Sequence, residues 1–445
     1  MLPKLLFATP AGTVLEHPNL LAIGRAGDDL LAPAEPPVAL PPHGKLVHLP
    51  GRRPVGFNPE TGAVEVLGRT SAGVGRRTFT PDAVAAVLPP GWTRTFLPAT
   101  RRDSGPPLPQ WAYAASGWGE RGPVVWAMRT DQRNHWDPSR FSTPDLERRV
   151  AGLLAELPGN RVLTQLQRCA LEYRCFTAQN IFYERDEGGL PGSTGCNARC
   201  QGCISQSRPG GPKASMERIP APPSAEELAE IGARHLARAR GRVMVSFGQG
   251  CEGEPLTRAT VLAKAIGLMR RRTGRGSVNI NTNGSLTEGL DALLGAGLDA
   301  VRVSLNSAHP DLYEAYYRPQ GYGLRNVERS IALARRRKAY IALNLLILPG
   351  VTDRAGEVDR LSRLIVKHRV DQLQARSLCI DADDYVKLAR GVGAGGAPMG
   401  VRAMLCALRR AAPWLVVGNF ARGICERRKN DGSDLPRNEA SPSQR

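Results

Sequence analysis

The chain has 445 residues, of which 42% are hydrophobic and 23% are charged. This balance is typical of a globular protein that is large enough for two or three domains. No apolar run approaches the roughly 18 residues of a membrane-spanning helix. The first residues also lack the charged-then-apolar layout of a secretory signal. The sequence therefore argues against an integral helical membrane protein and against export.

The chain is strongly basic, with a formal net charge of +19, and it contains nine cysteines. Such a charge favours a nucleic-acid partner where the basic residues form one patch. Here the dense runs 270–272 and 335–338 fall at the ends of predicted helices, where cations complement the helix dipole. RNA therefore stays open as a partner but is not favoured. The cysteines, in a chain without an export signal, predict a reducing, cytoplasmic compartment in which disulfides do not form.

Residues 1–160 are predicted to form a β-rich N-terminal domain of unknown role. Short apolar runs, among them 5–7, 46–49 and 124–128, alternate there with proline- and glycine-rich turns, which is the pattern of short strands. The segment carries no motif that points to chemistry, and we place His135 in a surface loop rather than in a polar site. A helix over 144–157 leads into the next domain.

Residues 161–385 are predicted to form an α/β domain, a partial (β/α)6 TIM-like barrel, because short apolar strands alternate with helices. The predicted strands are 243–247, 278–282, 300–305, 340–348 and 372–378, with 181–183 as a first strand before them. The predicted helices are 257–272, 287–296, 324–337 and 355–368, and Ser224 with Glu227 forms a capping box that opens another. Such sheets place their chemistry in the loops that follow the strands. A C-terminal extension over 386–427 and a disordered tail over 428–445 complete the predicted organisation.

Three cysteines stand within eight residues in the run CNARCQGC, namely Cys196, Cys200 and Cys203. Three thiolates at this spacing can hold three corners of an iron–sulfur cube and leave the fourth iron open for a small molecule. The alternative is a structural zinc loop. Zinc usually takes four protein ligands in paired spacings, and no fourth Cys or His follows within thirty residues. The run resembles the CxxxCxxC signature of the radical S-adenosylmethionine (SAM) superfamily.

A second segment, EGEP at 252–255, is similar to the GGEP segment of the same superfamily. It follows the first predicted strand after the cysteines, and in the family its backbone holds the amino group of SAM. Gly253 permits close approach of a backbone, and the carboxylate of Glu254 can accept hydrogen bonds from an ammonium. Glu252 replaces the first glycine of the family segment, which leaves open which backbone carbonyl does the holding.

Two later strand ends extend the resemblance. Thr282 and Asn283, in the segment NINTNGSL, would point into the mouth of the barrel, although an ordinary Asn-Gly turn is the alternative. Ser304 and Asn306 are two residues apart at a strand end, so we expect them to face the same side. In the family, residues at this place hydrogen-bond the carboxylate or ribose of SAM.

Other positions fit the resemblance less directly. Arg318 would pair with the carboxylate of SAM or lie on a helix surface, and residues 348–350 fall where the family contacts the adenine. The residue before the third cysteine is often aromatic in the family, but here it is Gly202. The adenine must therefore pack elsewhere, against Ile204 or the strand before 348–350. Among the remaining cysteines, Cys251 is expected to face the open iron, and the spacings do not favour a second cluster.

Together these segments imply a radical SAM enzyme in which Cys196, Cys200 and Cys203 bind a [4Fe–4S] cluster. The implied SAM-binding residues are Gly253, Glu254, Thr282, Asn283, Ser304 and Asn306. Family members use electrons from a donor such as flavodoxin or ferredoxin to cleave SAM to a 5′-deoxyadenosyl radical. The radical would abstract hydrogen from a small-molecule or peptide substrate, a step that needs no general acid or base, and the catalytic residues stay unknown. The alternatives are a radical SAM enzyme that modifies RNA and a non-catalytic zinc- or cluster-binding protein.

Overall fold

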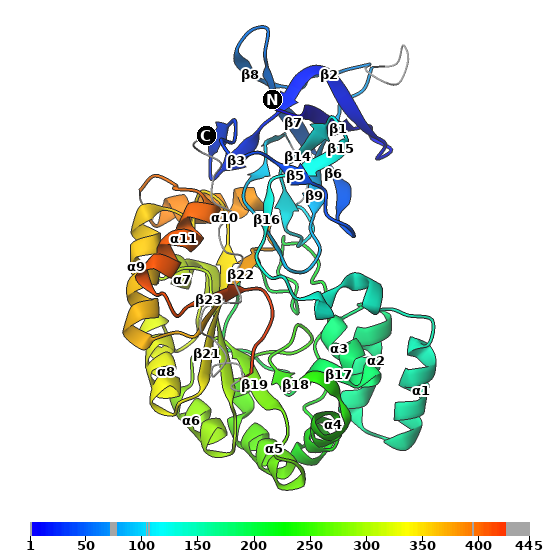
Figure 1. The fold of residues 1–445 in the computed structure, drawn as a ribbon, viewed down its shortest axis with the longest axis vertical. Helices are drawn as coiled ribbons and strands as arrows, with labels where there is room; N and C mark the ends of the chain where they lie inside the picture. The colour runs from blue at the N-terminus through cyan, green and yellow to red at the C-terminus, as the bar shows by residue number, and fades with distance from the viewer. Residues whose placement is uncertain (1, 72–77, 104, 106, 394–395, 424–445) are drawn as a thin grey trace, which may run out of the picture.

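The computed structural model describes residues 2–71, 78–103, 105, 107–393 and 396–423. The described chain has two parts, an N-terminal region of short strands and a curled sheet that is covered on its outside by helices (Figure 1). Among the described residues, no helix combines the length and the hydropathy that crossing a membrane requires. The tail predicted to be disordered, 428–445, lies outside the described residues.

The N-terminal region is built mainly of antiparallel strands, which confirms the prediction of a β-rich segment. Its largest sheet runs in the order β12-β7-β2-β1-β14-β15-β5, with β9 pairing β1, β6 and β13. The strands are β1 (Lys4–Ala8), β2 (Val14–Ala22), β3 (Gly24–Ala26), β4 (Asp29–Leu31), β5 (Val38–Ala39), β6 (Lys45–Leu49), β7 (Arg52–Asn58), β8 (Ala63–Val66), β9 (Asp82–Val87), β10 (Trp92–Arg94), β11 (Leu97–Pro98), β12 (Thr100–Arg102), β13 (Tyr113–Ala114), β14 (Ser116–Gly119), β15 (Gly122–Val125) and β16 (Ala127–Arg129). Small apolar clusters, one around Phe7 and one around Trp126, lie between them.

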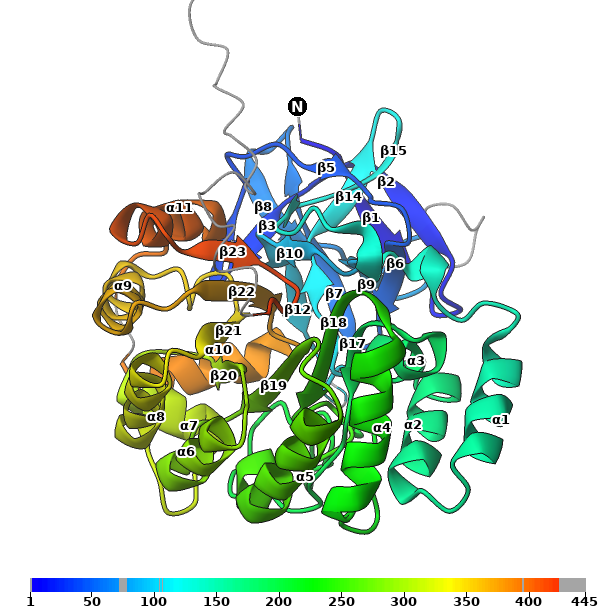
Figure 2. The same cartoon turned by 60° about the horizontal axis from the view of Figure 1, so that its bottom comes forward.

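The second part is a parallel sheet whose strands follow one another in sequence order and curl into a partial barrel (Figure 2). The strands are β17 (Arg185–Gly189), β18 (Arg240–Phe247), β19 (Ser277–Thr282), β20 (Ala300–Leu305), β21 (Tyr340–Ile347), β22 (Gln372–Ser377) and β23 (Val416–Gly418). The prediction of a strand at 181–183 is wrong. These residues end helix α3, which Glu184 terminates in the left-handed conformation (φ 51°), and β17 begins directly after it. β23 adds a strand from the segment predicted as an extension.

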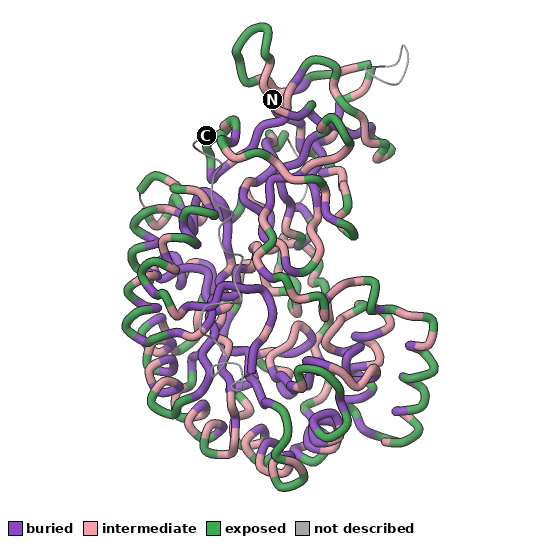
Figure 3. Tube along the Cα trace, in the orientation of Figure 1, coloured by how far each residue is buried: buried purple, intermediate pink, exposed green. Residues whose placement is uncertain are grey.

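Helices cover the outer face of the barrel, where their exposed sides form much of the surface (Figure 3). They are α1 (Leu146–Glu156), α2 (Arg161–Leu171), α3 (Phe176–Tyr183), α4 (Ala225–Arg238), α5 (Ala259–Arg272), α6 (Thr287–Gly295), α7 (Pro310–Tyr317), α8 (Leu324–Arg336), α9 (Ala355–His368), α10 (Ala382–Gly391) and α11 (Val401–Ala411), with short 3-10 turns at Asn134–Trp136, Pro138–Arg140 and Pro255–Arg258. The predicted capping box of Ser224 and Glu227 opens α4. α1 lies within the segment predicted as the N-terminal domain, yet its apolar side chains belong to the core of the barrel.

The two faces of the barrel sheet differ sharply in chemistry. The outward side chains are aliphatic and fully buried under the helices, as Val303 and Leu343 are. The inward side chains at the next positions are polar, as Ser304 and Asn344 are. In a closed TIM barrel the interior is filled by branched aliphatic residues. The polar interior of this sheet therefore indicates a cavity rather than a packed core.

The N-terminal region contacts the barrel at the strand ends where chemistry is expected. Strand β10 lies beside β22, where the Thr93 hydroxyl donates to the Ala375 carbonyl (2.7 Å). The buried guanidinium of Arg94 donates to the Leu378 carbonyl (2.7 Å). These bonds hold the N-terminal region over the mouth of the barrel.

Candidate functional site

A cavity of about 600 Å³ opens at the carboxyl ends of the barrel strands. Its wall consists of the cysteine loop, the loops after β18 and β19, the inward side chains of β19–β22, and residues 88–92 of the N-terminal region. Pockets of this size hold small-molecule ligands. The mouth is where a parallel α/β sheet is expected to bind its ligand.

The three cysteines of the predicted cluster motif, Cys196, Cys200 and Cys203, line this cavity together. Burial raises the pKa of the Cys200 thiol, and the nearby Cys203 and Cys196 raise it further. A buried group of thiols becomes a favourable set of thiolates when a metal centre supplies positive charge. Among the described residues, no three His, Cys, Asp or Glu side chains gather closely enough to surround a single ion. Three cysteine thiols, donors of the kind that hold iron–sulfur clusters, nevertheless line one wall of the cavity.

Two backbone hydrogen bonds and one side chain hold the cysteine loop in place. The backbone N–H groups of Arg199 and Gln201 donate to the carbonyls of Tyr317 (3.0 Å) and Tyr316 (2.8 Å) at the end of α7. The side chain of Asn197 joins the loop to the segment after β19, as described below. Sequence reasoning missed Asn197, because its partners lie more than 80 residues away along the chain.

Gly253 and Glu254 lie directly against the start of the cysteine loop. Their backbone N–H groups donate to the carbonyls of Ser193 (2.9 Å) and Gly195 (2.8 Å). A Cβ at Gly253 would lie 1.9 Å from the Gly195 oxygen. Only glycine fits so close an approach of two backbones. The EGEP segment and the cysteine loop are thus one unit.

Glu252 and Glu254 are both buried, and each carboxylate binds backbone donors. Glu252 accepts from the N–H groups of Gly192 (2.8 Å), Ser193 (3.1 Å) and Gln249 (2.9 Å), and also from that of Gly248. Its side chain therefore ties the residue stretch before the cysteines to the loop after β18, which gives a structural reason for a glutamate in place of glycine. Burial raises the pKa of Glu252 to about 8, against the opposing effect of these N–H donors.

Glu254 uses both of its oxygens within the protein. Its carboxylate accepts from the N–H groups of Leu256 (3.0 Å) and Asn283 (2.8 Å) and from the Thr282 hydroxyl. Burial raises the pKa of Glu254 to about 7. The Glu254 carboxylate was expected to accept hydrogen bonds from the ammonium of SAM. In the structure it links the EGEP segment to the end of β19.

Thr282 and Asn283 line the cavity at the end of β19, as the sequence predicted. The Asn283 amide donates to the Asn197 side-chain oxygen (2.8 Å), and Asn197 in turn donates to Ser285 (2.9 Å). The polar strand end therefore has two roles, because it faces the cavity and also positions the cysteine loop.

Ser304 lines the cavity, but Asn306 does not lie beside it. β20 ends at Leu305, so the alternation of side chains that placed both residues on one side stops before Asn306. The Asn306 amide is buried and donates to the Leu312 carbonyl (3.1 Å) and the Tyr385 hydroxyl (3.0 Å). The expectation that Ser304 and Asn306 face the same side is wrong.

Two other predicted contacts also lie away from the cavity. Arg318 is exposed at the left-handed end of α7 and does not line the wall. Gly350 packs against Gly27 of the N-terminal region, where a Cβ would lie 1.8 Å from the Gly27 nitrogen. The Pro349 carbonyl accepts from that nitrogen (2.9 Å). Residues 348–350 therefore serve the contact between the two parts of the chain.

Comparison with known proteins identifies this region. Residues 190–361 match the family model of the radical SAM superfamily. These residues are therefore similar to a radical SAM domain. A stretch of 161 residues is also 27% identical to molybdenum cofactor biosynthesis protein 1 of Bos taurus, and it covers 36% of this chain and 23% of that protein. The chain thus spans about a quarter of the length of the curated relative that it matches.

Solved structures resemble the radical SAM domain over part of the chain. The similarity to methylornithine synthase covers 60% of this chain and 73% of that one, with 13% identity and a TM-score of 0.37. The similarity to a radical SAM methyltransferase from Sphaerobacter thermophilus covers 48% of this chain and 66% of that one, with 17% identity and a TM-score of 0.33.

Gly202, which stands where the family often has an aromatic residue, lies beside an aromatic side chain from α7. A Cβ at Gly202 would lie 2.8 Å from the Tyr316 hydroxyl oxygen. Tyr316 is buried at the end of α7 and lines the cavity, as do Tyr317 and Ile204. The space beside the third cysteine is therefore filled by an aromatic ring that lies more than 100 residues downstream. The sequence offered no spacing by which to find it.

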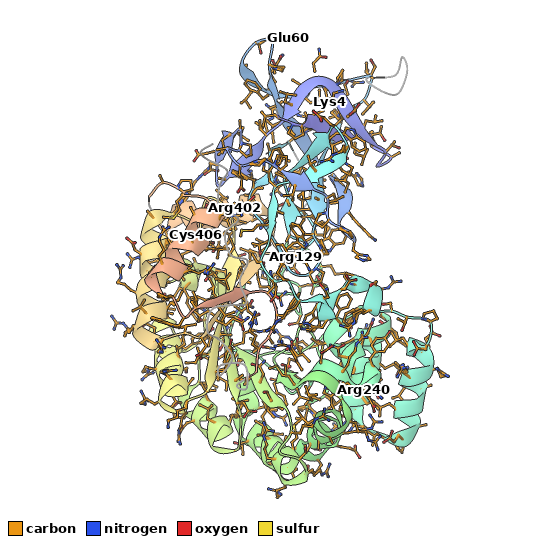
Figure 4. All side chains as sticks on the ribbon, in the orientation of Figure 1. Lys4, Glu60, Arg129, Arg240, Arg402 and Cys406 are labelled. Carbon is orange, nitrogen blue, oxygen red and sulfur yellow. The ribbon has the colours of Figure 1, made fainter. Side chains whose placement is uncertain are left out.

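The other cysteines of the chain divide differently from the expectation. Cys251 is buried and does not line the cavity, and its thiol instead lies near that of Cys169 on α2. The prediction that Cys251 faces the open iron is wrong. Cys379, after β22, does line the cavity. Cys406 is exposed on α11, outside the barrel (Figure 4).

Proposed function

We propose that the chain is a radical SAM enzyme in which Cys196, Cys200 and Cys203 bind three irons of a [4Fe–4S] cluster and leave the fourth for SAM. The observation that carries this proposal is that the three thiols line one cavity with the EGEP segment and the end of β19. When bound, the reduced cluster and SAM supply a 5′-deoxyadenosyl radical that abstracts hydrogen from the substrate. The protein supplies binding, orientation and shelter.

The residues that we propose for SAM are those on the β18–β20 side of the cavity. Gly253 brings the backbone of the EGEP segment next to the cysteine loop. Glu254, Thr282, Asn283 and Ser304 line the cavity. We leave out Asn306, because it does not line the cavity. Tyr316 is our candidate for the aromatic surface beside the adenine.

The N-terminal region has a proposed role in excluding water from the cavity. The Gln110 amide donates to the Cys203 carbonyl (3.1 Å), so this region contacts the cluster loop directly. Residues 88–92 and Ala112 complete the cavity wall. A closed site protects a reactive intermediate from water and oxidants. We therefore propose that the substrate reacts between the barrel and this cover.

A small molecule or a peptide is the proposed substrate class, and RNA is the alternative. The basic runs that raised the RNA hypothesis are partly neutralised by carboxylates, since Arg270 pairs with Asp299 and Arg337 pairs with Asp291. Such paired arginines form an ordinary solvated face. We further propose a flavodoxin or ferredoxin as the electron donor and the cytoplasm as the compartment.

Anaerobic reconstitution tests the proposed function. The holoprotein should bind iron and sulfide, absorb in the visible range, and release 5′-deoxyadenosine from SAM with dithionite. Cys200→Ala should abolish these properties, whereas Cys406→Ala, a control on the exposed face of α11, should retain them. Zinc in place of iron, or no 5′-deoxyadenosine even with cell extract as a source of substrate, would contradict the proposal. RNA that stays bound after a high-salt wash would favour the RNA alternative.

A further inference from the structure

The wall of the cavity also contains two arginines that the proposed SAM site does not use. Arg302 on β20 and Arg376 on β22 both line the cavity, on either side of β21. In the strand register Arg302 lies opposite Ala342, and Arg376 lies opposite Leu346. The two cations are close enough that Arg302 lowers the pKa of Arg376.

Among the described residues, no carboxylate lies in ion-pair contact with either arginine, although Glu187 acts on both from a distance. Arg302 donates only to the neutral side chain of Gln374 (3.1 Å), and Arg376 makes no hydrogen bond or ion pair with a described residue. The carboxylates that influence Arg376 are already engaged. Glu187 accepts from Ser246 (2.6 Å), and Asp131 accepts from the backbone N–H groups of residues 419 and 420 (3.0 and 3.2 Å).

Both arginines are nevertheless charged in the folded protein. Burial, aided by the neighbouring cation, lowers the pKa of Arg376 to about 10, which is still well above neutral. A buried charge is unfavourable unless it is paired and hydrogen-bonded. By contrast, Arg218, on the cysteine side of the cavity, donates to Ser205 (3.1 Å) and to the Thr194 carbonyl (3.3 Å). Two unpaired cations facing one cavity therefore indicate a place for an anion that arrives with a ligand.

Neutral polar groups beside the arginines are also unsatisfied. The Asn344 side-chain oxygen and the Asn281 side-chain nitrogen have no hydrogen-bond partner among the described residues. Both residues line the cavity, and Asn281 lies opposite Arg302 in the strand register. Buried polar atoms are normally hydrogen-bonded, so each of these atoms calls for a partner from a ligand or from water.

We propose that Arg302 and Arg376 bind an anionic group of the substrate, a carboxylate or a phosphate, with Asn344 as a neutral neighbour. A guanidinium presents a planar fork of donors that matches either oxyanion. The inference rests on the proposed function, since it assigns a substrate class to the same cavity. The carboxylate of SAM is the competing occupant. Arg302 shares β20 with Ser304, whereas Arg376 lies on β22, a strand that carries none of the proposed SAM residues.

Calorimetric titration of the anaerobic holoprotein, saturated with SAM, tests this assignment. The probes are inorganic phosphate, glutarate and the uncharged glutaramide. We expect one of the two anions to bind and glutaramide not to bind, and the anion that binds distinguishes a phosphate from a carboxylate site. Arg376→Gln and Arg302→Gln should weaken that binding at least about tenfold. Arg240→Gln, at the exposed start of β18 (Figure 4), should leave it unchanged.

Two further measurements separate the possible outcomes. Arg376→Gln should bind SAM as the unchanged protein does and should still release 5′-deoxyadenosine with dithionite. Loss of SAM binding in this variant would assign the arginines to SAM and overturn the proposal. An unchanged affinity of the variant for the anion would overturn it too, as would a failure of the unchanged protein to bind either anion. The Tm of Arg376→Gln should be close to that of the unchanged protein, because the substitution removes no hydrogen bond or ion pair with a described residue, and a clearly lower Tm would indicate a structural role instead. Failure of the proposed function is distinct, since the unchanged protein itself would then release no 5′-deoxyadenosine.

Discussion

The two sides of the cavity are built in opposite ways. On the cysteine side the polar groups are already bonded within the protein: Glu252 and Glu254 collect backbone donors, and Asn283 holds Asn197. On the side formed by β21 and β22, Arg376 and Asn344 line the cavity with donors or acceptors that are free among the described residues. The polar side chains of the first side are thus fixed by the protein before any ligand binds, whereas those of the second side are free to bind a ligand. This difference predicts which substitutions damage the fold and which damage only binding.

The largest expected effect is that of Gly253→Ala on the organised side. The new Cβ would meet the Gly195 oxygen at 1.9 Å, so the EGEP segment and the cysteine loop must separate. We expect a loss of about 2–3 kcal/mol in the free energy of unfolding and little bound iron or SAM. Iron analysis, SAM binding and urea denaturation measure these changes. Gly295→Ala is the matched control, because its Cβ meets no atom within 4 Å. Full iron and SAM binding in Gly253→Ala would show that the close approach is not required.

Glu252→Ala should have a smaller but still large effect. The substitution leaves four backbone N–H groups, those of residues 192, 193, 248 and 249, without their acceptor. Unsatisfied buried donors destabilise a protein by about 1–3 kcal/mol each, although water can re-enter at most of the site, so we expect a total loss of ~2 kcal/mol. Urea denaturation of the apoprotein measures it without interference from iron. Glu288→Ala, at an exposed position of α6, should change the stability by less than about 0.5 kcal/mol. Equal stability in the two variants would contradict a structural role for Glu252.

Part of this contrast was predictable from the sequence. The cysteine spacing, the apolar strands and the capping box of Ser224 are local patterns, and the structure has the predicted strands and helices of the barrel close to the expected residues. The tie between Asn197 and Asn283 and the ring of Tyr316 at Gly202 depend on contacts between residues far apart in the chain. No local pattern encodes them.

A weaker signal was present in the strands but was not used. Arg302 stands between Val301 and Val303, and Asn344 stands between Leu343 and Leu345. A strand alternates its side chains between two faces, so one polar residue between two aliphatic ones indicates a polar inner face. Treating the strands as continuous apolar segments concealed the polar interior and its arginines.

Asn344→Leu tests the unorganised side and should hardly change stability. The Asn344 oxygen has no partner among the described residues, so a leucine of similar size removes no hydrogen bond. We expect a change of less than about 1 kcal/mol by urea denaturation, together with normal iron content and normal release of 5′-deoxyadenosine. The affinity for the anionic probe should fall. A loss of stability as large as that of Glu252→Ala would remove the distinction between the two sides.

The smallest effect on ligand binding is expected for Cys251→Ala, although Cys251 directly precedes Glu252 of the organised side. Cys251 points away from the cavity, into the core beside Cys169, so it supplies neither a cluster ligand nor a wall atom. Iron per chain and the yield of 5′-deoxyadenosine should match those of the unchanged protein, while truncation of the buried thiol costs about 1 kcal/mol of stability. Cys196→Ala, measured in parallel, should lose most of its iron, because Cys196 lines the cavity. If Cys251→Ala lost iron to the same extent at an unchanged Tm, Cys251 would have to reach the cluster. The cluster site would then include Cys251, a residue that does not line the cavity in the structure.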